Sequence, residues 1–400
     1  MPQIITFLGK GGSGRTTVAI AAAKQQANLG RRVLFVSQDP TPATGILLDV
    51  PLTDKPQSIG ANLEVVLISA TAAIERGWED IKQVEARYLR SPFLRNVYGQ
   101  ELAIIPGMES AIALNALRQY DASGKYDTIV YDGTGDITTL RMAGMSDSLS
   151  WYLRRFVAVV EESDLWKTIG PIMQPAMATI GALVWTGESV SSQPLQEANN
   201  ALAVSQTVIG NPQRVVGYLV TTEEPAAVAT AKYLWGSAQQ SGLTIGGIIF
   251  NQGANDPVVG LEFAPLAVTT LPTRIGIDWQ PLLDAMPDFS QAIDAPKPIA
   301  IDILKREVRL YLPGFDKTQV KLTQSGPEVT IEAGDQRRNI LLPPPLKGSS
   351  VTGAKFQSGY LIISFWSRFL AAVTGAKEVS ERFGRRGLRQ KAEKSEDDLL

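Results

Sequence analysis

The 400-residue sequence contains no cysteine and no histidine. Without cysteine the chain can form neither a disulfide nor a thiolate nucleophile, and without histidine it has no imidazole base. The two absences together exclude zinc sites of the usual nitrogen and sulfur type, so no zinc is expected. Any catalysis must therefore use carboxylates, cationic side chains, hydroxyls, backbone dipoles or Mg²⁺.

An excess of charge of either sign is also lacking. The 38 lysine and arginine residues are balanced by 40 aspartate and glutamate residues, which gives a formal net charge of -2. This balance provides no electrostatic footprint for nucleic acid or for an anionic membrane. We therefore expect no nucleic-acid partner and only indirect contact with a membrane.

Membrane-spanning and targeting segments are not expected either. A charge-free stretch between Lys167 and Glu188 is long enough to suggest a membrane span. Prolines and glycines interrupt it, namely Gly170, Pro171, Pro175 and Gly181. We therefore expect a helix end and a buried strand there. The N-terminus lacks the basic region and cleavage site of a signal peptide, which predicts a cytoplasmic protein.

The first three quarters of the chain, residues 1–295, alternate short apolar runs with helical stretches. The runs include "IITFL", "RVLFVS", "DTIVYD", "VVGYLV" and "IGGIIF", each bounded by turn residues. Continuous apolar strands that alternate with helices are typical of a parallel sheet covered on both faces. The pattern therefore predicts a doubly wound, mostly parallel α/β domain, with a helical insertion at about residues 142–210.

The hydrophobic period changes after the proline-rich stretch "DAPKPIA". Apolar residues alternate with polar ones in "EVRLYLPGF", "EVTIEAG" and "GYLIISF", and no helical stretches lie between these runs. Period two over several short runs predicts an antiparallel β-sandwich at residues 300–365. A helical and then charged tail follows at residues 366–400. We expect few contacts to cross the proline-rich joint, so that the sandwich folds on its own.

The glycine-rich run "FLGKGGSGRTT", residues 7–17, lies between an apolar strand and an apolar helix. In that position the glycines can bend the backbone until several N–H groups and the helix N-terminus point at one anion. A glycine-rich turn without a ligand is the alternative. The residues predicted to surround the phosphates are Gly9, Lys10, Gly11, Gly12, Ser13, Gly14, Arg15, Thr16 and Thr17. The Thr16 hydroxyl is placed where it would bind Mg²⁺ directly.

The same run resembles a known loop. "GKGGSGRTT" is similar to the deviant Walker A motif of the arsenite-pump, tail-anchor-targeting, ParA, MinD and nitrogenase iron-protein ATPases. "VLFVSQDPTPATG", "YDTIVYDGTGDITTLR" and "VVGYLVTTEEPAAVATAKYLW" resemble later segments of the arsenite and tail-anchor branch. The sequence is therefore identified as a member of the tail-anchor-targeting (Get3/ArsA-like) family. The resemblance implies a homodimer that uses ATP and Mg²⁺.

The C-terminal part also carries a resemblance. "LPGF" after an alternating strand and the final "GYLIISF" are similar to the α-crystallin, or small heat-shock, sandwich. Such a domain is appended to relatives of these ATPases in cyanobacteria and plastids. The chain has none of the cysteines that bind zinc or arsenite in other branches, so neither a zinc-clamped dimer nor metalloid transport is expected.

The resemblance also implies roles for individual residues. Lys10 would reach across the dimer interface to the phosphates of the neighbouring subunit, Asp39 would hold the hydrolytic water, and Asn251 would contact the base. Asp132 ends the strand "TIVYD", where the carboxylate of a Walker B motif holds hydrated Mg²⁺ through water. An aspartate at a strand end is more often a turn former or a helix cap, and this reading stays open.

Arg15 departs from the motif, which has a second lysine at this position. Lysine is a compact charge that fits between phosphate oxygens, whereas the guanidinium is planar and forked. The exchange keeps the charge and loses the fit, so nucleotide binding is expected to survive better than catalytic alignment. The sequence is compatible with a slow ATPase and with an ATP binder of negligible turnover.

The insertion suggests what the nucleotide controls. It is rich in methionine and aromatic residues, namely Met142, Met145, Met173, Met177, Trp151, Phe156, Trp166 and Trp185. In the resembled family, helices at this place form a hydrophobic groove, and methionine suits varied apolar partners; ordinary core packing is the alternative. We predict an ATP-switched dimer that captures hydrophobic protein segments. A nucleotide-binding scaffold or holdase is the second class, and a ParA- or MinD-type positioning ATPase is disfavoured by the insertion and the sandwich.

Overall fold

The structure is a computed structural model that describes residues 1–73, 107–152, 194–253 and 260–366. An eight-stranded sheet occupies the first part, in the order β3-β4-β2-β5-β1-β6-β7-β8. Every neighbouring pair is parallel except β3 and β4. The strands are β1 Gln3–Leu8, β2 Val33–Ser37, β3 Gln57–Gly60, β4 Leu63–Leu67, β5 Thr128–Asp132, β6 Val215–Thr221, β7 Ile245–Asn251 and β8 Ala267–Leu271.

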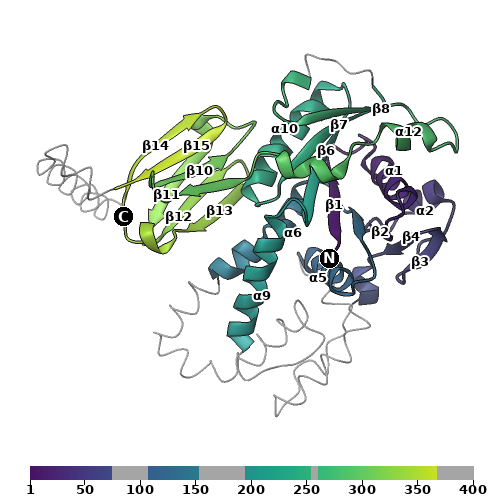
Figure 1. Cartoon of the computed structure of the whole chain (residues 1–400), viewed down its shortest axis with the longest axis horizontal. Helices are drawn as coiled ribbons and strands as arrows, with labels where there is room; N and C mark the ends of the chain where they lie inside the picture. The colour runs from purple at the N-terminus through teal and green to yellow at the C-terminus, as the bar shows by residue number, and fades with distance from the viewer. Residues whose placement is uncertain (74–106, 153–193, 254–259, 367–400) are drawn as a thin grey trace, which may run out of the picture.

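Helices cover both faces of this sheet (Figure 1). They are α1 Arg15–Asn28, α2 Ala43–Leu48, α5 Met108–Ala122, α6 Ile137–Ala143, α9 Pro194–Ile209, α10 Pro225–Gln240 and α12 Gln280–Ala285, followed by the 3-10 helix η2 Phe289–Asp294. Because side chains alternate along a strand, Ile5 and Phe7 of β1 pack in the core with α1. Ile4 and Leu8 pack on the opposite face, in the cores with α5 and α10. This arrangement confirms the predicted doubly wound, mostly parallel sheet.

The core beneath α1 is completed from far along the chain. Phe289 of η2 is fully buried there. Its ring lies 4.9 Å from that of Tyr218 and 6.3 Å from that of Phe7, measured between centroids. Leu282 and Leu283 of α12 belong to the same core. Residues 280–294 therefore close the face of the sheet on which α1 lies.

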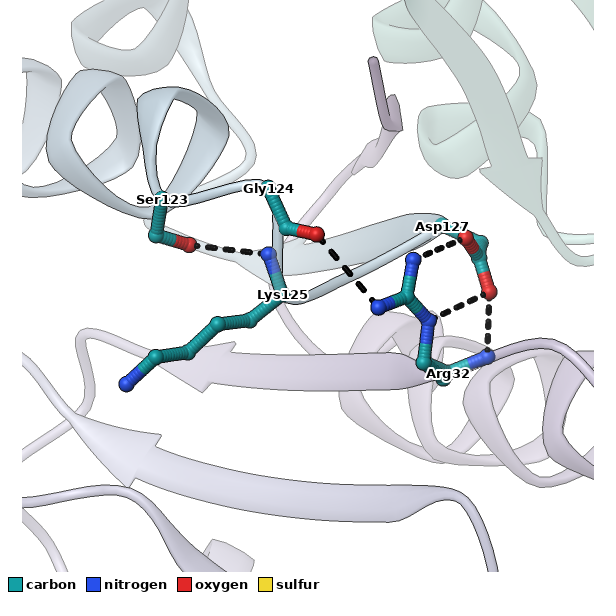
Figure 2. A network of polar contacts seen from close by, with 5 residues as sticks. All are labelled: Arg32, Ser123, Gly124, Lys125 and Asp127. Atoms are coloured by element: carbon teal, nitrogen blue, oxygen red, sulfur yellow. Dashed lines mark hydrogen bonds and ion pairs between the residues drawn. The ribbon is translucent and has the colours of Figure 1, made fainter.

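The turn between α5 and β5 is fastened to the start of β2 (Figure 2). Arg32 donates its Nε and Nη2 hydrogens to the two carboxylate oxygens of Asp127, at 3.0 and 2.7 Å. The Arg32 backbone N–H donates to the same carboxylate at 2.9 Å. These hydrogen bonds hold the pKa of Asp127 down at about 2. The contact fixes the turn at the edge of the sheet opposite to the ends of β2 and β5 where Ser37 and Asp132 lie.

The second part consists of two antiparallel sheets, in the orders β14-β15-β10-β9 and β11-β12-β13. The strands are β9 Ile299–Asp302, β10 Glu307–Tyr311, β11 Val320–Ser325, β12 Glu328–Ala333, β13 Gln336–Leu341, β14 Val351–Gln357 and β15 Tyr360–Phe365. Alternate residues such as Val308, Leu310, Val329 and Ile331 face a shared core and are fully buried. The predicted C-terminal sandwich of antiparallel strands is therefore confirmed.

The expectation that few contacts cross the proline-rich joint is wrong. The ring of Trp235 on α10 lies 5.7 Å from that of Tyr311, and the ring of Tyr233 lies 5.8 Å from that of Phe315. A Cβ atom at Gly236 would overlap a backbone oxygen of the segment between β10 and β11, so glycine is needed for this close approach. The composition of a linker limits the linker itself and does not exclude complementary faces on either side of it.

Among the described ranges, no helix is both long and apolar enough to cross a membrane. The charge-free stretch between Lys167 and Glu188 lies outside those ranges, as does most of the predicted tail.

Candidate nucleotide site

The glycine-rich loop joins β1 to α1 at the carboxyl edge of the sheet, where open α/β sheets bind ligands. Gly12 and Gly14 both have φ of 85°, in the region that favours glycine. A Cβ atom at Gly9 would overlap the backbone oxygen of Val220, and one at Gly14 would overlap the side-chain amide of Asn251. Glycine is therefore required here by the packing of the loop against β6 and β7, in addition to any ligand.

Asp132 lies at the end of β5 and is only 5% exposed. The Thr16 side chain hydrogen-bonds its carboxyl group, while burial raises the pKa of Asp132 to about 6. Its Oδ2 atom has no hydrogen-bond partner among the described residues. A buried carboxylate oxygen without a protein partner, next to a threonine hydroxyl, fits a hydrated Mg²⁺ ion, which binds oxygen ligands and retains water. Thr16 and Asp132 are thus the residues that could hold the metal.

The Arg15 side chain contacts the segment that follows Asp132. Its Nη1 atom donates to the backbone oxygen of Thr134. Gly135 has φ of 61°, and a Cβ atom at this position would overlap the guanidinium. Burial lowers the pKa of Arg15, while Asp132 and Asp136 act in the opposite direction. The guanidinium therefore joins the start of α1 to the residues after β5, through a hydrogen bond and close packing.

Further hydrogen bonds fix the segment after β5. The Gly9 N–H donates to the Gly135 oxygen at 2.9 Å, and the Gly135 N–H donates to Thr139 Oγ1 at 2.9 Å. Asp136 is the N-cap of α6, where its side chain accepts the Thr138 N–H at 2.8 Å. The segment thus joins the glycine-rich loop to α6.

Lys10 forms an ion pair within its own chain. Its Nζ atom lies 3.2 Å from Glu224 Oε2, and the two side chains are 40% and 52% exposed. Glu224 is the N-cap residue of α10. The exposure of Lys10 leaves room for another partner, and its role in a neighbouring subunit stays a prediction.

Asp39 follows β2 at the same edge of the sheet. Its carboxylate accepts hydrogen bonds from the Thr41 backbone N–H and from Thr41 Oγ1, both at 2.9 Å. It lines a groove of about 580 Å³ together with residues of α2 and of the segment before β3. Its charge contributes to the raised pKa of Asp132, so the structure brings the two predicted carboxylates together.

Asn251 ends β7 and is 2% exposed. Its Nδ2 atom donates to the Ser13 backbone oxygen at 2.9 Å, which fastens the glycine-rich loop to β7. Contact with a base stays a prediction for this residue.

Sequence reasoning missed three residues that hold this site in place, namely Glu224, Thr134 and Thr139. Only Glu224 had a local signal, because Pro225 follows it at the start of a helix.

Two of the methionines in the predicted insertion are described. Met142 is buried in the core with α5, and its sulfur accepts from the Tyr131 hydroxyl at 3.7 Å. Met145 is half-buried. Trp151 is half-buried, and the Arg337 guanidinium lies 5.0 Å from the centre of its ring. Core packing therefore accounts for Met142, while Met173, Met177, Phe156, Trp166 and Trp185 lie outside the described residues.

Comparison with protein families places the chain in a family. Residues 2–260 match the family model described as "Anion-transporting ATPase". The chain belongs to this family. Residues 305–365 match a second model, "HSP20-like domain found in ArsA", which agrees with the small heat-shock resemblance of the sandwich.

One similar protein covers most of the chain, and two others cover over a third of it. "Putative arsenical pump-driving ATPase 1" of Aquifex aeolicus is 23% identical over 90% of this chain and 99% of its own. "Putative arsenical pump-driving ATPase" of Chlorobaculum tepidum is 30% identical over 38% of each chain. "ATPase ASNA1 homolog" of Plasmodium chabaudi chabaudi is 30% identical over 38% of this chain and 39% of its own. Membership in this anion-transporting ATPase family supports ATP binding and ATPase chemistry at the site.

Proposed function

We propose that the protein is a slow, Mg²⁺-dependent ATPase that works as a homodimer. The observation that carries this proposal is the buried Asp132 carboxyl group at the edge of the glycine-rich loop. It is hydrogen-bonded to Thr16, and its Oδ2 atom has no partner in the part of the chain that the structure describes. When bound, Mg²⁺ supplies positive charge that offsets the charge of the phosphate oxygens. Thr16 would hold it directly and Asp132 would hold it through water.

The remaining residues would position the substrate. Backbone N–H groups of residues 9–17 and the N-terminus of α1 attract the triphosphate of ATP. Asp39 would orient the attacking water, Asn251 would lie near the base, and Lys10 would serve the neighbouring subunit. Lys10 must then leave Glu224, which costs little because an exposed ion pair contributes at most about 1 kcal/mol.

Arg15 is the reason for proposing slow turnover. A guanidinium that donates to the Thr134 backbone oxygen is not free to take the position of a lysine beside the transferring phosphate. The same contact favours the second candidate, a protein that binds ATP and hydrolyses it at a negligible rate.

Hydrophobic protein segments are the proposed clients, in membrane-protein targeting or in chaperone-like capture within the cytoplasm. Support comes from the composition of residues 142–210 and from the HSP20-like match of the sandwich. A ParA- or MinD-type positioning role gains no support from this combination.

Three measurements on the purified protein test the proposal. Titration with ATP and Mg²⁺ tests binding, phosphate release tests hydrolysis, and sedimentation with and without nucleotide tests the dimer. Failure to bind adenine nucleotides would refute the whole proposal, and binding without phosphate release would favour the second candidate. Hydrolysis should be measured with and without an apolar client peptide, since a change with the peptide supports client handling.

A further inference from the structure

Two helices connect the nucleotide site to the sandwich (Figure 1). α10 starts after Glu224, the partner of Lys10, and its later residues contact β10 and β13. α6 starts after Asp136, which belongs to the segment held by Arg15. Arg141, in the last turn of α6, reaches the sandwich. The two helices also contact each other.

The contact of α6 is with the turn between β12 and β13, residues 333–336, named here the β12–β13 turn. The Arg141 guanidinium forms an ion pair with the Asp335 carboxylate. The Asp335 backbone N–H donates to the Tyr233 hydroxyl of α10 at 3.1 Å. Gly334 has φ of 56°, and a Cβ atom there would lie 3.0 Å from the Tyr233 ring. The turn is therefore fitted against both helices at once.

Neighbouring contacts keep the turn in place. Arg338 of β13 donates from Nη1 to the Gln239 backbone oxygen at the end of α10, at 2.7 Å. The Arg337 guanidinium lies over the ring of Trp151, which follows α6. Arg141 and Asp335 are 58% and 59% exposed, so their ion pair changes an equilibrium by at most about fivefold. We therefore expect the ion pair to fix the position of α6 against the β12–β13 turn and to contribute little to the overall stability of the protein.

We propose that the β12–β13 turn of the sandwich positions the segment of residues 134–136 at the nucleotide site, with Asp335 and Arg141 as positioning residues. α6 has only 7 residues. It is therefore about 10 Å long and transmits a shift of one end to the other. Arg15 and Gly9 hold its start, and Asp335 holds its end. The inference rests on the proposed ATPase function.

A charge-swap cycle tests the proposal in the full-length protein. Arg141→Asp and Asp335→Arg are each expected to lower kcat by up to about fivefold, with KM for ATP changing less. The double variant Arg141→Asp with Asp335→Arg restores an ion pair and should recover most of the rate. Lys305→Asp is the control, because it breaks another exposed ion pair of the sandwich, with Asp302, and should leave the rate unchanged.

Hydrogen exchange provides a readout that does not depend on hydrolysis. The single variants should increase exchange in residues 134–143, the double variant should restore protection, and melting temperatures should stay close to that of the wild type. Single variants with unchanged exchange and unchanged kcat, or a double variant without recovery, would overturn the proposal. If the wild type neither binds nor hydrolyses ATP, the proposed function fails, while the exchange pattern still decides whether the sandwich positions this segment.

Discussion

Replacement of Asp132 by asparagine should make the protein more stable at neutral pH while it weakens the binding of MgATP. Asp132 is almost completely buried, and one of its oxygens has no partner among the described residues. Burial raises its pKa from 3.8 in the unfolded chain to about 6. The Asp132 carboxyl group therefore binds its proton more tightly in the folded protein than in the unfolded chain.

The sign and the size of the effect follow from this difference. A carboxyl group whose pKa is raised in the folded protein stabilises the fold when it is protonated. This stabilisation is complete below pH 3.8 and is lost as the pH rises through about 6. The ionised form then costs about 3 kcal/mol of unfolding free energy at pH 7.5 relative to acidic pH. About half of that cost develops between pH 5 and pH 7.5. Asparagine carries no charge and avoids it.

Urea denaturation at several pH values between 5 and 7.5, without Mg²⁺ or nucleotide, measures the difference between the wild type and Asp132→Asn. The stabilisation by asparagine should grow with pH by about 1 to 2 kcal/mol over this range. Asp127→Asn, just before β5, is the control: Arg32 lowers the pKa of Asp127 from 3.8 to about 2, so this carboxylate is ionised in the folded and the unfolded protein throughout this range. Its replacement should lower stability by an amount that does not change between pH 5 and pH 7.5. A stabilisation that is absent, or that shrinks as pH rises, would refute the reasoning.

Three other outcomes are expected. Arg15→Lys should raise the rate of phosphate release, because lysine loses the bond to the Thr134 oxygen and can reach the phosphates; an equal or lower rate would show that the site depends on the guanidinium. Lys10→Ala should reduce hydrolysis by at least about tenfold. The melting temperature should change little, because the ion pair between Lys10 and Glu224 is exposed. A variant that is still dimeric and hydrolyses ATP at the wild-type rate would exclude a role of Lys10 in the neighbouring subunit. Gly236→Ala should lower stability by about 1 to 3 kcal/mol, because the added methyl group overlaps backbone of the sandwich; an unchanged melting temperature would contradict the docking described here.

The parts of the site that were predictable are those encoded in adjacent residues. The loop of residues 9–14 and Asp132 each follow an apolar strand. The carboxyl ends of parallel strands lie at the same edge of the sheet, so these residues come close together. The alternation of Val308, Leu310 and their counterparts likewise predicted the sandwich. Local pattern and local structure agree in these segments.

The parts that could not be predicted are contacts between distant segments. Arg15 and Thr134 are 119 positions apart, and Asn251 and Ser13 are 238 positions apart. No periodicity indicates that a guanidinium will find a particular backbone oxygen, because that choice depends on how the finished elements pack. The docking of the sandwich on α10 was mispredicted for the same reason, since the complementarity of Gly236 with the sandwich backbone is a property of the assembled faces.

The closing of the core by Phe289 has a consequence during synthesis. The ring that packs against Phe7 and Tyr218 is made about 280 residues after the strand that carries Phe7. The ribosome adds about 5 to 20 residues per second, so the buried face of α1 waits at least about 15 seconds for its cover. Until η2 emerges, the apolar side of the newly made sheet is exposed to chaperones and to other chains. Nascent chains released shortly before residue 289 should therefore aggregate, and chains that extend beyond residue 294 should be the first to become soluble.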